Sequence, residues 1–109
     1  MAQDFERNTS NAVGTSAATL RTANSDDAII GIRCVNKSSS AVTVTVQITD
    51  SGSTTYNVIS AAPIPVGGSL ELIDGGSKIV MQTGDVLKAF ADTASAVDVL
   101  TSIVDSIST

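Results

Sequence analysis

The 109-residue chain contains no histidine, no tryptophan and one cysteine, and each scarcity removes a class of site. Without histidine, a serine or cysteine nucleophile lacks its usual base, and zinc and other transition metals lose their commonest ligand. A lone cysteine, Cys34, cannot form an intrachain disulfide, and its apolar setting in "AIIGIRCVN" predicts a buried side chain rather than a reactive thiol. These features argue against an enzyme.

Aromatic residues make up only 3% of the chain, namely Phe5, Tyr56 and Phe90. The core must therefore be assembled from aliphatic side chains, each of which buries less area than an aromatic ring. A domain of this length also leaves a large fraction of its surface in water. We expect one domain that gains stability by burying further surface against a copy of itself or a neighbour.

Cations are also scarce, because six Lys and Arg stand against eleven Asp and Glu, for a net charge of −5. Nucleic acid and anionic membranes both require clustered cations, so neither is an expected partner. The opening "MAQDFERNTSNAVG" lacks the basic start and apolar stretch of a signal peptide, and no run approaches the roughly 20 apolar residues that span a bilayer. We expect a product made in a reducing cytoplasm.

Calcium is the metal whose ligands this composition could still supply, since several aspartates fall in predicted turns. They are Asp26, Asp27, Asp50, Asp74, Asp85 and Asp92. None has EF-hand spacing, and aspartate is common in turns because it bonds its own backbone. The turn interpretation is preferred, and no cofactor or metal is expected.

The clearest local pattern is the stretch "AVTVTVQITD", in which aliphatic residues alternate with Thr and Gln. This alternation predicts a strand with one buried face and one wet face. The preceding "AIIGIRCVN" is largely apolar in both phases, which predicts a central strand or one whose second face meets a partner. The short polar link "NKSSSA" predicts that the two strands form an antiparallel hairpin, and Gly31 is a candidate bulge.

Further short strands are predicted at "TTYNVIS", "SLELI", "KIVM", "DVLKAFA" and "AVDVLTSIV", with a weaker one at "ATLRTA". Pro63 and Pro65 predict that "AAPIP" is an edge or crossing segment. The stretch "VDVLTSIVDS" also fits helical spacing, but its β-branched residues favour a strand. About eight strands at 8–12-residue spacing predict an all-β antiparallel β-sandwich, jelly-roll or Ig-like.

The glycine-rich stretch from Ala62 to Asp85 needs a separate test, because glycines next to a lysine can cradle phosphate. A phosphate-binding loop requires Gly-Lys-Ser/Thr between a strand and a helix, whereas Lys78 follows Ser77 and precedes a predicted strand and turn. We therefore interpret Gly67-Gly68 and Gly75-Gly76 as turns.

The N-terminal segment is polar and rich in turn residues, so we predict an arm over residues 1–16 and a β-sandwich domain over residues 17–109. A flexible end is one interpretation of this arm. The alternative is an arm that lies on a neighbouring subunit, with Phe5 as its anchor and Glu6 and Arg7 beside it as partner-binding candidates.

Several segments, taken in order, carry a resemblance that covers nearly the whole chain. They are "AQDFERNTSNAVGTSAATL", "AIIGIRCVNKSSSAVTVTVQI", "NVISAAPIPVGGSLELIDGGSKIVMQTGDVLKAFA" and "ASAVDVLTSIVD". With them the chain resembles a family of small virion structural proteins of tailed bacteriophages, especially phages of marine bacteria. The Pro-x-Pro-x-Gly-Gly-Ser-Leu block is the most specific part, and no catalytic residues carry over.

The resemblance implies a β-sandwich that attaches to a phage particle. Its favoured form is a capsid decoration, or cement, protein that sits as a homotrimer on the major capsid protein of the head. A tail or neck (head-tail connector) component is the first alternative, because small sandwich domains serve both places. A carbohydrate-binding module is the second alternative, and the scarcity of aromatic residues argues against it.

Overall fold

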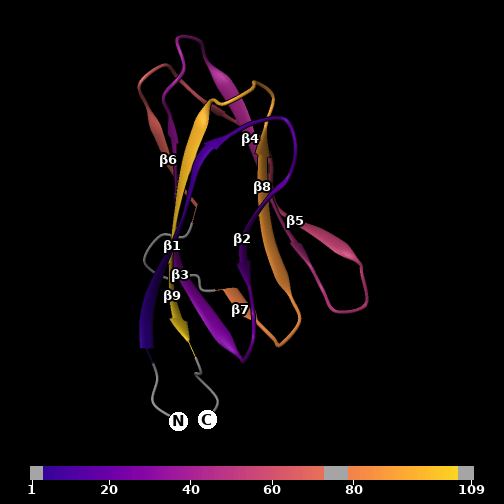
Figure 1. Cartoon of the computed structure of the whole chain (residues 1–109). Coiled ribbons are helices and arrows are strands. Elements are labelled where there is room, and N and C mark those ends of the chain that lie inside the picture. Colours follow the sequence, from indigo (N-terminus) through magenta and orange to yellow (C-terminus); the bar gives the residue numbers. More distant parts are fainter. Residues whose placement is uncertain (1–3, 73–78, 106–109) are drawn as a thin grey trace.

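The computed structural model describes residues 4–72 and 79–105, and all regular structure in these residues is β-strand. Figure 1 shows the strands arranged in two layers. The strands are β1 (Asp4–Val13), β2 (Ala18–Thr22), β3 (Asp27–Asn36), β4 (Val42–Thr49), β5 (Thr55–Ile64), β6 (Ser69–Glu71), β7 (Ile79–Met81), β8 (Val86–Ala91) and β9 (Val97–Asp105).

The two sheets have the strand order of a jelly roll. The first sheet runs β1-β9-β3, with β6 and β7 both pairing with β3, and the second runs β2-β8-β4-β5. Early strands pair with late ones throughout, as in β1 with β9, β2 with β8 and β4 with β5, and every pairing is antiparallel. The chain is therefore a long two-stranded ribbon rolled into two packed sheets. This confirms the predicted all-β sandwich.

The predicted hairpin between the stretches "AIIGIRCVN" and "AVTVTVQITD" is wrong. These stretches form β3 and β4, which lie in different sheets, and the polar link between them crosses from one layer to the other. The short connection indicated chain reversal correctly. The length of this link does not indicate which strands pair with β3 and β4, because those pairings depend on strands far away in the sequence.

The core between the sheets is aliphatic, as the composition predicted. Ile32 of the first sheet and Val44 of the second are both fully buried. Thr43, Gln47 and Thr49 lie on the opposite face of β4 and are only partly buried, which confirms its alternating pattern at these positions. Thr45 departs from the predicted wet face, because it is buried and its hydroxyl accepts from the N–H of Ala61 at 3.0 Å. The largest fully buried apolar side chains are Ile29, Ile32, Ile64, Met81, Leu87, Ile103, Val42, Val44, Val46, Val97 and Val99.

A bulge explains why both phases of β3 are apolar. The register between β3 and β9 shifts between Ile29 and Gly31, which confirms the bulge predicted at the glycine. Because the extra residue reverses the phase of the strand, Ile29 before it and Ile32 and Cys34 after it all face the core. Ile30 is left partly exposed.

The described part of the predicted N-terminal arm forms β1, an edge strand of the first sheet. It pairs with β9 from Asp4↔Asp105 to Val13↔Val97, with a register shift between Ser10 and Val13. Ala12 lies at this irregularity with a φ of 56°, in the left-handed region. Most inward-facing residues of β1 are polar, so its sequence lacks the apolar alternation that identifies the other strands.

Asn36, the last residue of β3, ties the crossing between the sheets to the end of β5. Its side chain is buried, and Nδ2 donates to the backbone carbonyl oxygens of Ser40 (2.8 Å), Ile64 (3.1 Å) and Pro65 (3.2 Å). Its Oδ1 accepts from the backbone N–H (2.9 Å) and the hydroxyl (2.8 Å) of Ser38. The amide thus satisfies backbone groups that no ladder reaches.

Two glycine turns of the Ala62–Asp85 stretch are confirmed. Gly67 has a φ of 70°, and the N–H of Gly68 donates to the carbonyl of Pro65 at 2.9 Å. Gly84 has a φ of 94° in the turn before β8. The second predicted glycine turn, Gly75-Gly76, and Lys78 lie outside the described residues.

Candidate functional site

The three partner-binding candidates lie on β1 and point to two different sides. Phe5 is 81% exposed and Arg7 is also exposed, both on the outer face of the first sheet. Glu6 points the other way, because successive side chains of a strand alternate between its faces. The structure therefore places Phe5 and Arg7 together and separates Glu6 from them.

Glu6 takes part in an ionic network at the margin of the sandwich. Arg21 of β2 lies 3.2 Å from the Glu6 carboxylate and 3.2 Å from that of Asp27, whose side chain is fully buried. Ser25 donates its hydroxyl to Asp27 at 3.1 Å. Because a buried carboxylate is stable only when paired and hydrogen-bonded, this network holds β1, β2 and β3 together. The role of Glu6 shown here is structural.

Phe5 begins a row of apolar side chains that crosses the outer face of the first sheet. It pairs with Val104 of β9, which pairs with Ala28 of β3, which pairs with Val80 of β7. In Figure 1 these four strands run side by side near the end that carries both termini. Val80 is 58% exposed, while Val104 and Ala28 are partly exposed. Directly opposed residues share a face of the sheet, so the four side chains form one continuous strip. We call this strip the Phe5 row.

The far end of the same face is polar and balanced in charge. The guanidinium of Arg33 on β3 contacts the carboxylate of Glu71 on β6. The ammonium of Lys37 lies 3.0 Å from Asp98 Oδ1 and donates to Asn11 Oδ1 at 2.6 Å. Neither pair is buried, so each contributes little to stability.

Asp98 carries the clearest electrostatic signature of this end. The backbone N–H of Ala12 donates to its Oδ1 at 2.8 Å. This bond, together with the neighbouring Lys37, lowers the pKa of the Asp98 carboxyl below its ordinary value. The left-handed conformation of Ala12 places that N–H outside the β1–β9 ladder, so the carboxylate caps the bulge.

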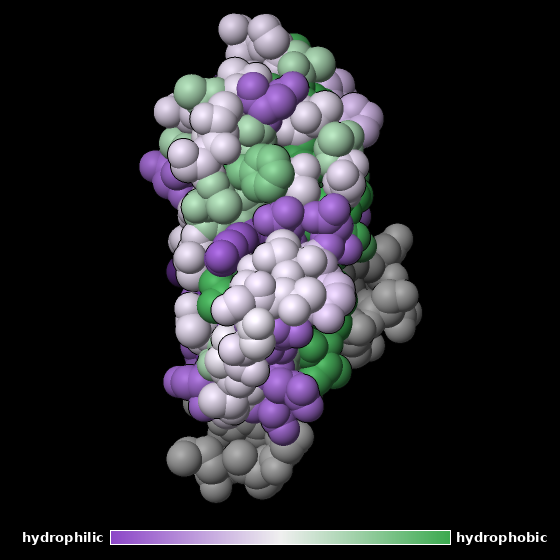
Figure 2. Space-filling model, turned by 90° about the vertical axis from the view of Figure 1, so that its right-hand side faces the viewer, coloured by the Kyte–Doolittle hydropathy of each residue, from purple (hydrophilic) through white to green (hydrophobic). Residues whose placement is uncertain are grey.

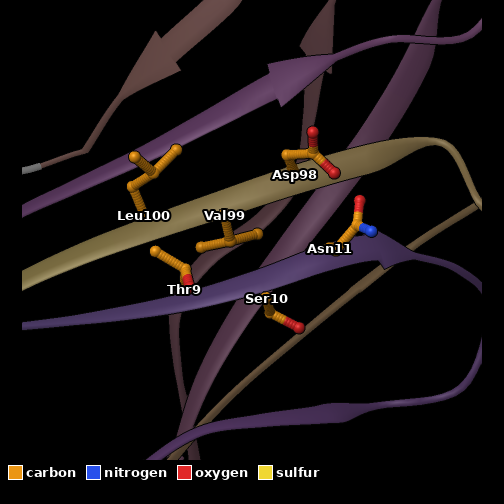
Figure 3. A pocket seen from close by; sticks show the side chains of 6 residues that line it. All are labelled: Thr9, Ser10, Asn11, Asp98, Val99 and Leu100. Carbon is orange, nitrogen blue, oxygen red and sulfur yellow. The ribbon is translucent and has the colours of Figure 1, made fainter.

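A shallow depression of about 270 Å³ lies beside Asp98. Figure 3 shows Asn11 and Asp98 pointing to one side of the two strands and Ser10 to the other. The residues that line the depression are Thr9, Ser10, Asn11, Asp98, Val99 and Leu100. Asn11 Oδ1 accepts from Lys37, and Asp98 Oδ1 accepts from Ala12 and lies beside Lys37, so these two acceptors are already engaged within the protein.

The outer face of the second sheet has a different character. Its hydroxyl and amide side chains bond one another across β4 and β5, Gln47 with Asn57 at 3.0 Å and Thr49 with Thr55 at 2.9 Å. Figure 2 shows this side of the molecule as mostly pale and purple residues with smaller green areas between them. These polar side chains thus satisfy one another across the two strands.

Cys34 lies in the core, as predicted from its apolar neighbours. It is free and fully buried, and desolvation raises the pKa of its thiol to about 11. The thiol is therefore protonated at neutral pH and is not a nucleophile. In the described part of the chain, no three His, Cys, Asp or Glu side chains are grouped so that they could hold a metal ion.

Val104, Ala28 and Val80 were not among the candidates taken from the sequence. The nearest sequence signal was the doubly apolar pattern of "AIIGIRCVN", which predicted either a central strand or one whose second face meets a partner. The bulge at Gly31 explains most of that pattern. The other members of the Phe5 row come from "KIVM" and "AVDVLTSIV", and no local pattern indicates that these segments share a face with Phe5.

Among the residues that the structure describes, no helix is long and apolar enough to cross a membrane. No family model, no curated protein and no solved structure matches this chain.

Proposed function

We propose that this chain is a non-enzymatic structural protein of a bacteriophage virion, and specifically a decoration protein that binds and stabilises the head shell. The observation that carries the proposal is the Phe5 row. An aromatic side chain that is 81% exposed, continued across three further strands by apolar residues, is suited to adhesion. The resemblance of the segments quoted above supplies the virion context.

The proposed mechanism is burial of surface. Copies of the chain pack against one another as a homotrimer and against the major capsid protein, so a shell opens only when several contacts break together. A standard interface buries roughly 1,600 Å² in total, which is enough for specific attachment, and many copies per shell add avidity. The net charge of −5 keeps free copies apart before they dock.

The number of copies per particle tests this proposal against its first alternative. We expect quantitative protein analysis of purified virions that carry the chain to give hundreds of copies, as decoration of a whole shell requires. Five, six or twelve copies would instead support a tail or neck component. Absence of the chain from purified particles would refute both.

The depression beside Asp98 is the place where the carbohydrate-binding alternative would have its site. Asn11 Oδ1 and Asp98 Oδ1 are committed to contacts within the protein, and no aromatic residue lines the depression for sugar stacking. Saturable binding of an oligosaccharide, lost in the Leu100→Ala variant, would favour that alternative over the virion role.

A further inference from the structure

We infer that the Phe5 row is a contact between copies of this chain, in which Phe5 of one copy packs over Ala28 of the next. This inference deepens the proposed function, since it names the surface that would build the homotrimer. It depends on four features of the first sheet: the shape of the row, its charge, its size and its place at a sheet edge.

The shape of the row provides both halves of such a contact. Phe5 is the largest side chain of the row and projects from the edge strand β1 with 81% of its surface exposed. Ala28 is the smallest and lies two strands further in, between Val104 and Val80. The row therefore has a protrusion at its edge and a low point about 10 Å away, as the spacing of neighbouring strands dictates. Since one chain carries both features, another copy fits without any further partner.

The charge of the face favours another copy over a charged partner. The chain as a whole carries a charge of −5, so two copies repel each other over most orientations. On this outer face the described charged side chains are nearly balanced. Arg7, Arg33 and Lys37 are its cations, and Glu71 and Asp98 are its anions. Copies can therefore approach through this face with little electrostatic cost.

The size of the face is also appropriate. The strands β1, β9 and β3, each of nine or ten residues, and the three-residue strands β6 and β7 beside β3 lie about 4.8 Å apart and together span about 500–600 Å² of flat area. A standard interface buries about 800 Å² of accessible surface on each partner, and accessible area exceeds flat area because side chains protrude. The row and its polar margin together supply the apolar centre and polar rim that specific interfaces have.

The positions of Phe5 and Ala28 bear on the symmetry of the contact. The protruding residue lies on β1 and the receiving residue lies on β3 of the same row. The proposed homotrimer requires a head-to-tail contact that closes into a ring, whereas a reciprocal contact between two copies would give a two-fold dimer. In the trimer, each copy presents Phe5 to one neighbour and Ala28 to the other.

Two single substitutions test the two halves separately. Phe5→Ala removes the protruding ring, and Ala28→Phe fills the receiving site. Both side chains lie outside the core, so circular dichroism should show both variants folded. We expect the wild-type chain of 11.0 kDa to sediment as a species of about three times that mass. Each variant should weaken self-association by roughly 10- to 100-fold, because burial of one aromatic ring is lost. Tyr56→Ala is the matched control, because Tyr56 is an aromatic residue that is 58% exposed but lies on the second sheet. This substitution should leave the assembly unchanged.

Mixing the two variants gives the decisive result. Phe5 is intact in the Ala28→Phe chain, and Ala28 is intact in the Phe5→Ala chain, so a mixture can form one native contact and no more. We expect a one-to-one pair in the mixture, whereas each variant alone is monomeric. If either variant does not fold, Val80→Ser on the same row replaces it and should also weaken assembly.

Wild-type chain that stays monomeric at all concentrations would overturn the inference. The same holds for an oligomer that Phe5→Ala and Ala28→Phe leave unchanged, or for variants that do not pair when mixed. These outcomes can be told apart from failure of the virion proposal, because the number of copies per particle tests that proposal by a separate measurement.

Discussion

Replacing Asn36 by aspartate changes one polar group at the point where the chain crosses between the two sheets. The Nδ2 group donates to three backbone carbonyl oxygens at 2.8–3.2 Å, and aspartate would place an oxygen there instead. The Oδ1 side is unaffected, because a carboxylate oxygen accepts the two Ser38 donors equally well. The substitution therefore tests the donor half of the amide alone.

The magnitude follows from the number of bonds lost. An amide has two N–H donors, so two of the three carbonyls lose a full hydrogen bond, and each buried group left unpaired costs about 1–3 kcal/mol. The substitution also leaves a buried carboxylate without a compensating partner, and a change of that kind typically costs about 3–5 kcal/mol as a whole. We expect a loss of roughly 3–5 kcal/mol in the free energy of unfolding. For a domain of this size that corresponds to a fall in Tm of roughly 12–30 °C.

Urea denaturation followed by far-UV circular dichroism measures the loss directly, since the native signal comes entirely from strands in the described chain. The matched control is Asn57→Asp on the exposed face of β5. There Oδ1 accepts from Gln47 at 3.0 Å, which a carboxylate also does, so the free energy of unfolding should change by less than about 0.5 kcal/mol. If Asn36→Asp unfolds at the same urea concentration as this control, the buried amide does not hold the crossing and the reasoning fails.

Three further predictions concern the core, the thiol and the carboxylate at the β1 bulge. Ile32→Ala and Val44→Ala should each lower the free energy of unfolding by roughly 1–4 kcal/mol, since both side chains are fully buried. Val80→Ala should have little effect, because Val80 is exposed. Chemical denaturation in which all three variants lose the same free energy of unfolding would contradict the assigned faces. Cys34 should react with a thiol reagent at mildly alkaline pH only after denaturant is added, because burial raises its pKa to about 11, and rapid labelling of the native protein would argue against a closed core. Asp98 has a lowered pKa when folded, so its contribution to stability is present above the unfolded pKa of about 3.9 and is lost as pH falls through the folded value. Urea titrations between about pH 6 and pH 3 should therefore show that the difference in free energy of unfolding between wild type and Asp98→Asn becomes smaller as the pH falls. A difference that stays constant over this range would show that the charge of the carboxylate does not contribute to stability.

The buried faces of the strands could be predicted from sequence because a strand has a period of two. The alternation in "AVTVTVQITD" predicted a buried aliphatic face, and Val44 on that face is fully buried. The doubly apolar "AIIGIRCVN" did not by itself choose a face for Ile32, which is also fully buried. The bulge at Gly31 was also visible, since a glycine interrupts a segment that is apolar on both sides. In each case the signal lies within ten residues of the feature it predicts.

Features that depend on distant pairing could not be predicted in this way. β1 carries Glu6, Asn8 and Ser10 on its inward side, so it forms a strand because β9 requires a neighbour rather than because of its own residues. The hairpin prediction for β3 and β4 failed for the same reason. Phe5 was selected as a candidate because aromatic side chains are favoured as anchors at interfaces. Ala28 and Val80 lie in one row with it only through three ladders whose registers no local pattern specifies.

The rolled ribbon has a consequence for the route by which the chain folds. β4 and β5 are neighbours in sequence and close a short loop, whereas β1 and β9 join opposite ends of the chain, and the entropic cost of closure rises with loop length. We therefore expect the ribbon to zip from its β4–β5 turn outward, with the β1–β9 ladder completed last. Phe5 and Val104 come together only at that final step, so a nascent or half-folded chain carries no finished adhesive strip and cannot join its neighbours too early.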